Sequence, residues 1–191
     1  MQSWKKARFM HRFILLLLFL YIQVHQAFAA QITISELESK NESDAYFISA
    51  KFNINFNDEI LEALIHGIPL TFNIELQTKA KHNWLPDQTI TSSVISHQLL
   101  YQPLTDDYLT INLKTGVRTF YDTLAAASLN IGHLKNQKLV DSYLLVDDLE
   151  YNGLVRMYLD RDKLPSPMRP QAYFSDKWQL ETEWHKWKIK K

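Results

Sequence analysis

The sequence predicts a mainly β (α+β) fold: an antiparallel β-sandwich or a strongly curved sheet with two short peripheral helices. Apolar and polar residues alternate along most of the chain, which is the period of half-buried strands. Strand-like segments mostly follow one another, without the regular βαβ alternation of a parallel sheet. The 191 residues, 46% of them hydrophobic, are enough for one domain with a real core.

The clearest strand is predicted over residues 46–56, because one of its faces is apolar throughout: Tyr46, Ile48, Ala50, Phe52, Ile54 and Phe56. An earlier strand contains Ile32 and Ile34, and the polar residues 40–44 form the turn between the two. Further strands are predicted over residues 70–77, 89–100, 108–114, 117–121, 139–146 and 154–159. The aromatic-rich end, residues 173–189, is expected to close the sheet.

Two short helices interrupt this pattern. Asn57 or Asp58 can cap a helix that runs to residue 66, where Gly67 and then Pro69 end it. A second helix is predicted from residue 122 or 123 to about residue 134. The proline-rich residues 164–170 are expected to form a stiff, extended connector.

Residues 1–29 have the pattern of a secretory signal peptide. Four basic residues lie within positions 5–12, an apolar run covers residues 13–22, and Ala27 and Ala29 fit a cleavage site after Ala29. The alternative is an uncleaved anchor, but a spanning helix needs about 20 apolar residues. We therefore expect a single β-rich domain, residues 30–191, located in the periplasm, with no membrane span left after cleavage.

Composition excludes several classes of function. The charges of the 21 basic and 21 acidic residues cancel, and without its basic leader the chain is mildly acidic. It therefore lacks the excess of positive charge that binds nucleic acid. Only four glycines occur and they are not clustered, which excludes glycine-rich nucleotide-binding loops. The absence of Cys excludes disulfides, thiolate zinc sites and cysteine nucleophiles. We expect no cofactor.

The acidic run at residues 147–153 is the best metal candidate. Asp148, Glu150 and Asn152 occupy the first, third and fifth positions of a calcium-type loop, with Gly153 in the sixth. Position twelve is Leu159, where such a loop needs a bidentate Glu. We therefore favour a polar hairpin turn and assign no metal.

No catalytic residue can be assigned from the sequence. The five histidines after residue 30 include no pair at zinc-site spacing, and no serine nucleophile motif occurs. Asp160 and Asp162 flank Arg161, which local charge balance at a strand end is enough to explain.

Aromatic residues near the end of the chain could form a platform for a ligand. Trp187 and Tyr173 are the candidate ligand-binding residues. A role in the fold is the stronger interpretation for this segment, because Trp178, Leu180 and Trp184 fall on one face of a predicted strand. Trp187 falls out of phase with that face.

Several motifs together resemble a family of uncharacterised exported proteobacterial proteins, a domain of unknown function. They comprise residues 50–56, 67–70, 96–101, 120–124, 156–160 and 164–167, with Trp178, Trp184 and Trp187. The resemblance implies no assigned activity. It implies an association with a membrane sensor kinase, beside which such proteins look to be encoded.

These observations predict a non-catalytic interaction module of the bacterial envelope, whose partner is an envelope or inner-membrane protein. Its sharpest version, which the family resemblance alone implies, is a regulatory partner of a membrane sensor kinase. One alternative is an envelope hydrolase or metal-dependent enzyme, which converging histidines and carboxylates in a pocket would favour. The other is an envelope assembly or structural factor, which a large exposed apolar patch or an open sheet edge would favour.

Overall fold

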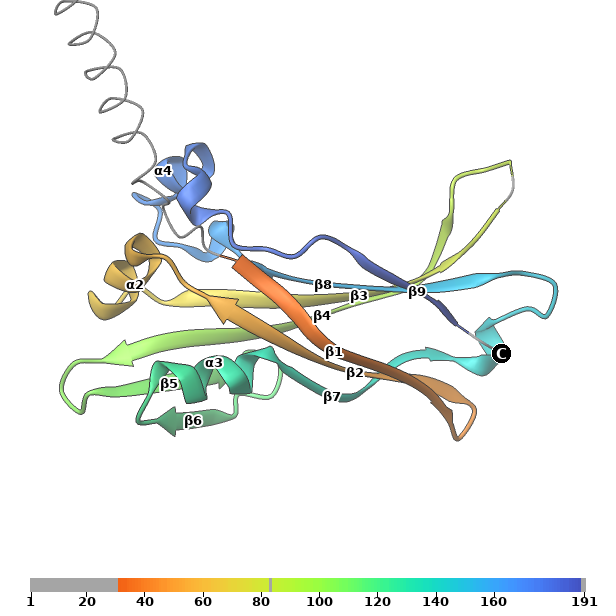
Figure 1. Cartoon of the computed structure of the whole chain (residues 1–191), viewed down its shortest axis with the longest axis horizontal. Coiled ribbons are helices and arrows are strands. Elements are labelled where there is room, and N and C mark those ends of the chain that lie inside the picture. Colours follow the sequence, from red (N-terminus) through yellow and green to blue (C-terminus); the bar gives the residue numbers. More distant parts are fainter. Residues whose placement is uncertain (1–30, 83, 190–191) are drawn as a thin grey trace, which may run out of the picture.

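Two antiparallel sheets form the body of the protein (Figure 1). The computed structural model describes residues 31–82 and 84–189. The smaller sheet has the order β1-β2-β7 and consists of β1 (Gln31–Glu42), β2 (Ala45–Asn55) and β7 (His133–Asp141). The larger sheet, of order β6-β5-β4-β3-β8-β9, consists of β3 (Leu70–Ala80), β4 (Gln88–Gln102), β5 (Asp107–Asn112), β6 (Arg118–Tyr121), β8 (Tyr151–Leu159) and β9 (His185–Ile189). The predicted mainly β fold is confirmed.

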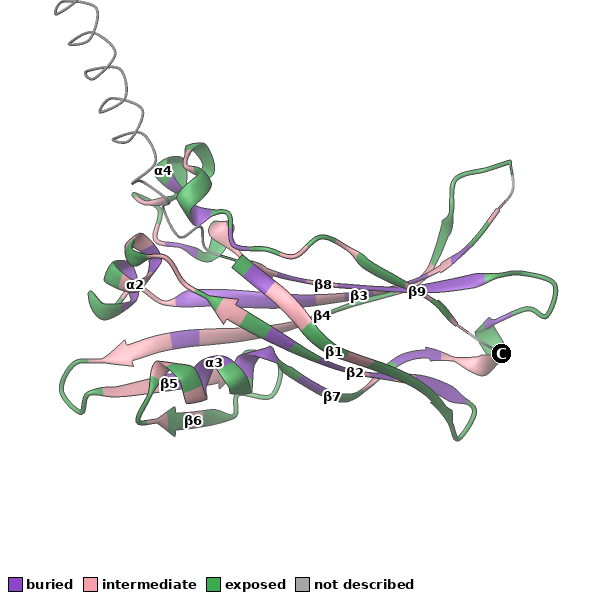
Figure 2. Cartoon of the chain, viewed as in Figure 1, coloured by how far each residue is buried: buried purple, intermediate pink, exposed green. Residues whose placement is uncertain are grey.

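One hydrophobic cluster joins the two sheets. Alternate residues of β2, from Tyr46 to Phe52, are buried together with alternate residues of β3, from Leu70 to Leu76, and of β8. Figure 2 shows this buried band running along β3 and β8, with exposed residues on β1 and the loops. The alternation in the sequence therefore reflects a core between two layers.

The first predicted helix is present as α2 (Asp58–Ile65). Asn57 caps it, since its side-chain oxygen accepts a hydrogen bond from the backbone N–H of Ile60 at 2.9 Å. Gly67 follows with a φ of 80°, a left-handed conformation that glycine adopts without strain. Ile60 and Leu64 are fully buried, so the helix closes one end of the core.

The second helix, α3 (Leu124–Gly132), is shorter than predicted. It ends at Gly132, whose α carbon lies so close to the backbone of Phe52 that a Cβ atom there would overlap the carbonyl oxygen. His133 then begins β7, where a strand was expected only from residue 139. β7 ends at Asp141, and the 3₁₀ turn η1 (Ser142–Leu144) replaces the remainder of that predicted strand.

The proline-rich connector is not the extended segment predicted. Residues 166–168 form a turn, and residues 169–170 begin a further α-helix of the described chain, α4 (Arg169–Phe174), which the sequence did not predict. Pro170 lies in the first turn, where its missing N–H costs nothing. Two 3₁₀ turns flank this helix, η2 (Arg161–Lys163) and η3 (Asp176–Trp178). Over the described ranges, no helix is both long and apolar enough to cross a membrane.

Candidate ligand-binding cleft

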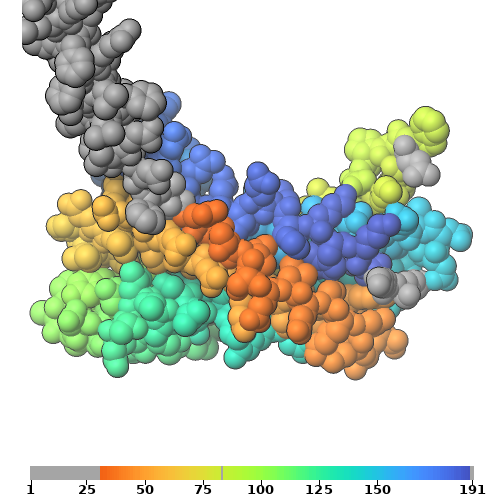
Figure 3. All heavy atoms as spheres, viewed as in Figure 1, coloured from red at the N-terminus to blue at the C-terminus, as the bar shows by residue number. Residues whose placement is uncertain are grey.

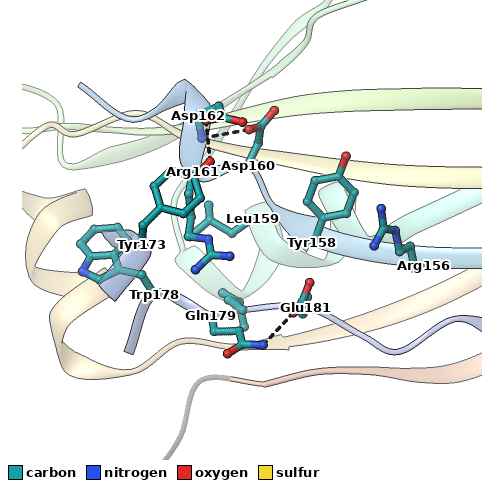
Figure 4. Close-up of a pocket in the computed structure, with 11 residues that line it drawn as sticks. Arg156, Tyr158, Leu159, Asp160, Arg161, Asp162, Tyr173, Trp178, Gln179 and Glu181 are labelled. Atoms are coloured by element: carbon teal, nitrogen blue, oxygen red, sulfur yellow. Dashed lines mark hydrogen bonds between the residues drawn. The ribbon is translucent and has the colours of Figure 1, made fainter. Parts of the chain in front are cut away.

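A cleft opens beside the carboxyl end of β8, where the segment after η3 runs alongside that strand (Figure 4). Its cavity has a volume of about 210 Å³. Arg156 and Tyr158 line it and alternate along β8 with the fully buried Val155 and Met157, so the cleft lies on the sheet face opposite the core. Its other lining residues are Leu159, Asp160, Arg161, Asp162, Tyr173, Trp178, Gln179, Leu180 and Glu181.

Backbone hydrogen bonds hold the two walls together. The N–H of Leu159 donates to the carbonyl of Leu180 at 2.8 Å, and the N–H of Thr182 donates to the carbonyl of Met157 at 2.8 Å. Tyr158 and Glu181 form an isolated antiparallel bridge between these bonds. The side chains of both walls therefore project from hydrogen-bonded backbone, a more exact support than a free loop.

Arg161 supplies the cation of the cleft. Its guanidinium carbon lies 4.9 Å from the centre of the Tyr173 ring, and one of its N–H groups donates to the carbonyl of Ala172 at 3.3 Å. No carboxylate of the described residues lies within ion-pairing distance of this half-buried group. In Figure 4 the guanidinium points into the cavity, toward the segment that carries Gln179.

The two aspartates beside Arg161 are held by other partners. Asp160 accepts hydrogen bonds from the side chain of Asn73 at 2.9 Å and from the N–H of Asp162 at 3.1 Å. Asn73 in turn accepts a hydrogen bond from the hydroxyl of Ser96 at 2.7 Å. Asp162 accepts the hydroxyl of Tyr173, and this hydrogen bond raises the pKa of Tyr173 above its usual range. Both carboxylates therefore have fixed positions within a polar network.

Arg156 already has a counter-ion. Its Nε and Nη2 atoms donate to one carboxylate oxygen of Glu75 at 2.9 Å and 2.7 Å. Aromatic rings lie on the same guanidinium, with ring centres 4.8 Å away for Tyr158 and 4.5 Å away for Trp184. Its charge is neutralised in place, so Arg156 serves as a wall of the cleft.

Glu181 lies across the cavity from Arg161, beside Gln179 on the same segment (Figure 4). The side-chain amide of Gln179 donates to one oxygen of the exposed Glu181 carboxylate at 2.8 Å. The cleft therefore presents one guanidinium and, opposite it, one carboxylate, neither of which is ion-paired to another described side chain.

Of the two predicted ligand-binding residues, the structure places Tyr173 in the cleft and Trp187 outside it. The ring of Trp187 packs against Gly153 of β8, and its indole N–H is buried without a described hydrogen-bond partner. From the sequence, local charge balance with Asp160 and Asp162 is enough to explain Arg161. A lone arginine between two aspartates at a strand end can be assigned a role only when the hydrogen-bond partners of those aspartates are known.

The metal candidates do not come together as a loop. The carboxylate of Glu150 lies 3.2 Å from the amine of Lys81 and 3.5 Å from that of Lys188, and its pKa is lowered, chiefly by the hydrogen bond from Lys81. Asn152 is buried within β8, whereas Asp148 is exposed in the preceding turn. Within residues 31–82 and 84–189, no three His, Asp or Glu side chains are grouped as metal ligands.

The fold and the cleft define a mainly β domain with two antiparallel sheets and a polar, aromatic-walled cleft on one outer face. Residues 29–188 match the model of the DUF4390 family, described as a domain of unknown function, and the chain belongs to this family. No curated protein and no solved structure matches the chain.

Proposed function

We propose that this protein is a non-catalytic interaction module of the bacterial periplasm, exported by a cleaved signal peptide, which binds its ligand in the cleft around Arg161. The observation that carries the proposal is a half-buried guanidinium aimed into a cavity without a carboxylate partner. A guanidinium that is already held in place and keeps free donors can pair with an anionic ligand group at little cost in side-chain ordering.

The arrangement of the cleft supports binding rather than catalysis. None of its described lining residues is His, Ser or Cys. Asp160 and Asp162 are acceptors in fixed hydrogen bonds, where a catalytic acid or base needs its carboxyl free to reach a substrate. This distribution of partners favours an interaction module over an envelope hydrolase.

We further propose that the module regulates a membrane sensor kinase, a role that rests on the family resemblance. Phe174, 93% exposed, follows Tyr173 at the end of α4 and offers a position for a photo-crosslinking amino acid. We expect crosslinking in cells to capture the kinase from position 174, and the Arg161→Met substitution to abolish the product. A crosslinker at Leu104, 100% exposed on the β4–β5 turn, is the control. Capture that is indifferent to Arg161, or equal from position 104, would refute a role for the cleft.

A second candidate, an envelope assembly factor, is favoured by exposed apolar side chains and an open edge. The hairpin between β3 and β4 projects from the body and carries Trp84, 96% exposed, and Leu85, 69% exposed (Figure 3). Strand β1 is an edge of its sheet, paired only with β2 among the described strands. Crosslinking from position 84 to an envelope assembly protein, unaffected by Arg161→Met, would favour this function.

A further inference from the structure

The geometry points to a specific ligand class for the cleft: a free, zwitterionic α-amino acid, whose carboxylate pairs with Arg161 and whose ammonium pairs with Glu181. This inference rests on the proposed function and specifies the ligand. It follows from the unused hydrogen-bonding capacity of the two side chains, the overall charge of the cleft, and its size.

Arg161 is equipped to bind a carboxylate. A guanidinium carries five N–H donors in a planar fork that matches a carboxylate with two parallel hydrogen bonds. Among the described residues, only one of these donors has an acceptor, the carbonyl of Ala172. The ring of Tyr173 lies 4.9 Å from the guanidinium carbon and limits where the fork can point. The side chain is thereby positioned, with donors left for a ligand.

Glu181 is equipped to bind an ammonium group. One of its carboxylate oxygens accepts the amide of Gln179, and the other has no described partner. It lies on the wall opposite Arg161 (Figure 4). An ammonium group needs acceptors, and the carboxylate oxygen that Gln179 leaves free can supply one.

The charge balance of the cleft selects against simple ions. Two arginines, Arg156 and Arg161, stand against four carboxylates: Glu75, Asp160, Asp162 and Glu181. This excess of negative charge disfavours a ligand that carries only a carboxylate, and a ligand that carries only an ammonium would leave Arg161 without a counter-ion. A zwitterion has no net charge and can satisfy both groups.

The size of the cavity selects a small ligand. Its volume of about 210 Å³ is below the ~300–1,000 Å³ typical of pockets for drug-sized molecules. An oligosaccharide or an extended peptide would therefore project far outside it. A single amino acid fits, with its side chain directed toward the rings of Tyr173 and Trp178.

Isothermal titration calorimetry of the purified protein against the standard L-α-amino acids tests the inference. The amino acid that binds best is then compared with its N-acetyl derivative, which lacks the ammonium, and its amide, which lacks the carboxylate. We expect each derivative to bind about 10- to 100-fold more weakly, the size of one lost charge-assisted hydrogen bond. Arg161→Met and Glu181→Gln should weaken binding of the unmodified amino acid by similar factors. Arg118→Met, on the exposed edge strand β6, is the matched control and should change nothing.

Each outcome separates the ligand class from the proposed function. If the amide or the N-acetyl derivative bound as tightly as the unmodified amino acid, or if no amino acid bound, the inference of a zwitterionic ligand would be overturned. If the crosslink from position 174 then still depends on Arg161, the proposed function stands and only the ligand class fails. Thermal melts confirm that each variant is folded, and Arg161→Lys, which keeps the charge but loses the fork, replaces Arg161→Met if that variant does not fold.

Discussion

The indole ring of Trp187 covers the α carbon of Gly153 on the neighbouring strand. The two residues are direct partners in the register of β8 and β9, and a Cβ atom added to Gly153 would overlap ring atoms of the tryptophan. Thr78 of β3, fully buried, is paired to Gly153 on its other side. The missing side chain of Gly153 therefore makes room for the ring that closes this part of the core.

Replacing Gly153 should consequently destabilise the protein through overpacking. We expect Gly153→Ala to lower the free energy of unfolding by about 1–3 kcal/mol, since the ring must move out of its site. Urea denaturation measures the loss. The double variant Gly153→Ala/Trp187→Val should be more stable than the sum of its single substitutions predicts, because the smaller side chain removes the clash. If the changes in free energy of unfolding were strictly additive, the ring of Trp187 would not clash with a side chain at position 153.

The ion pair of Arg156 and Glu75 should matter more than those at the surface. Their side chains are 32% and 14% exposed, so removing one partner leaves a poorly hydrated charge. We expect Arg156→Met to cost about 1–3 kcal/mol of unfolding free energy. Adding Glu75→Gln to this variant should recover part of the loss. The control is Lys40→Met, which breaks the exposed Lys40–Glu42 pair and should cost at most about 0.5 kcal/mol. If Arg156→Met and Lys40→Met lowered the free energy of unfolding equally, burial would not be what distinguishes the two ion pairs.

His97 should make stability depend on mildly acidic pH. Burial lowers its pKa, because the charged ring would lose hydration, and its Nδ1 has no described partner. The unfolded chain therefore takes up the proton first as the pH falls through the ordinary histidine value, ~6.5. Stability is fully present above that value and declines as the pH falls toward the lowered pKa of the folded state.

Thermal melts between pH 7.5 and pH 5, run alongside His97→Gln, measure this effect. As the pH falls, the melting temperature of His97→Gln should decline less than that of the unmodified protein. The control His185→Gln, at an exposed position of β9, should decline as the unmodified protein does. An identical decline in His97→Gln would assign the pH dependence to other groups.

Local periodicity predicted the strands of the core, and it failed where the register of the sheet shifts. Residues 46–56 alternate without interruption, and β2 covers nearly the same range. Between the bridge Tyr158–Glu181 and the pair Val155–His185 the register slips by one residue. The slip turns Trp184 to the outer face, over Arg156, and turns Trp187 toward the core. The prediction that Trp184 shares a buried face with Trp178 and Leu180 was therefore wrong, because a bulge has no signature in alternation alone.

The candidate site was predictable only in part, for a similar reason. Tyr173 belongs to the aromatic-rich end of the chain, which predicts it as a candidate ligand-binding residue, and it does line the cleft. The role of Arg161 depends on Asn73, a residue of β3 far away in sequence, which holds the carboxylate of Asp160. Long-range pairing of this kind follows from sheet order, which periodicity does not determine.

The leader remains a prediction, because residues 1–30 lie outside the described residues. We expect the mature protein to begin at Ala30, one residue before β1, whose Ile32 is already buried. Intact-mass measurement on protein from the envelope fraction would give the mass of residues 30–191. A mass that retains residues 1–29 would instead indicate an anchored domain.

The tryptophans should rank by burial and not by their spacing in the sequence. Trp178 is 3% exposed, and its indole N–H donates to Glu59 at 2.9 Å. Trp178→Ala should therefore cost about 3–5 kcal/mol, as for other buried aromatic side chains. Trp184 is half-buried and loses mainly its contact with Arg156, so Trp184→Ala should cost about 1–2 kcal/mol. Trp84→Ala, at the exposed hairpin tip, is the control and should stay within about 0.5 kcal/mol. Urea denaturation of the three variants gives the order directly. If Trp184→Ala cost as much as Trp178→Ala, Trp184 would belong to the core and the register slip between β8 and the terminal segment would be wrong.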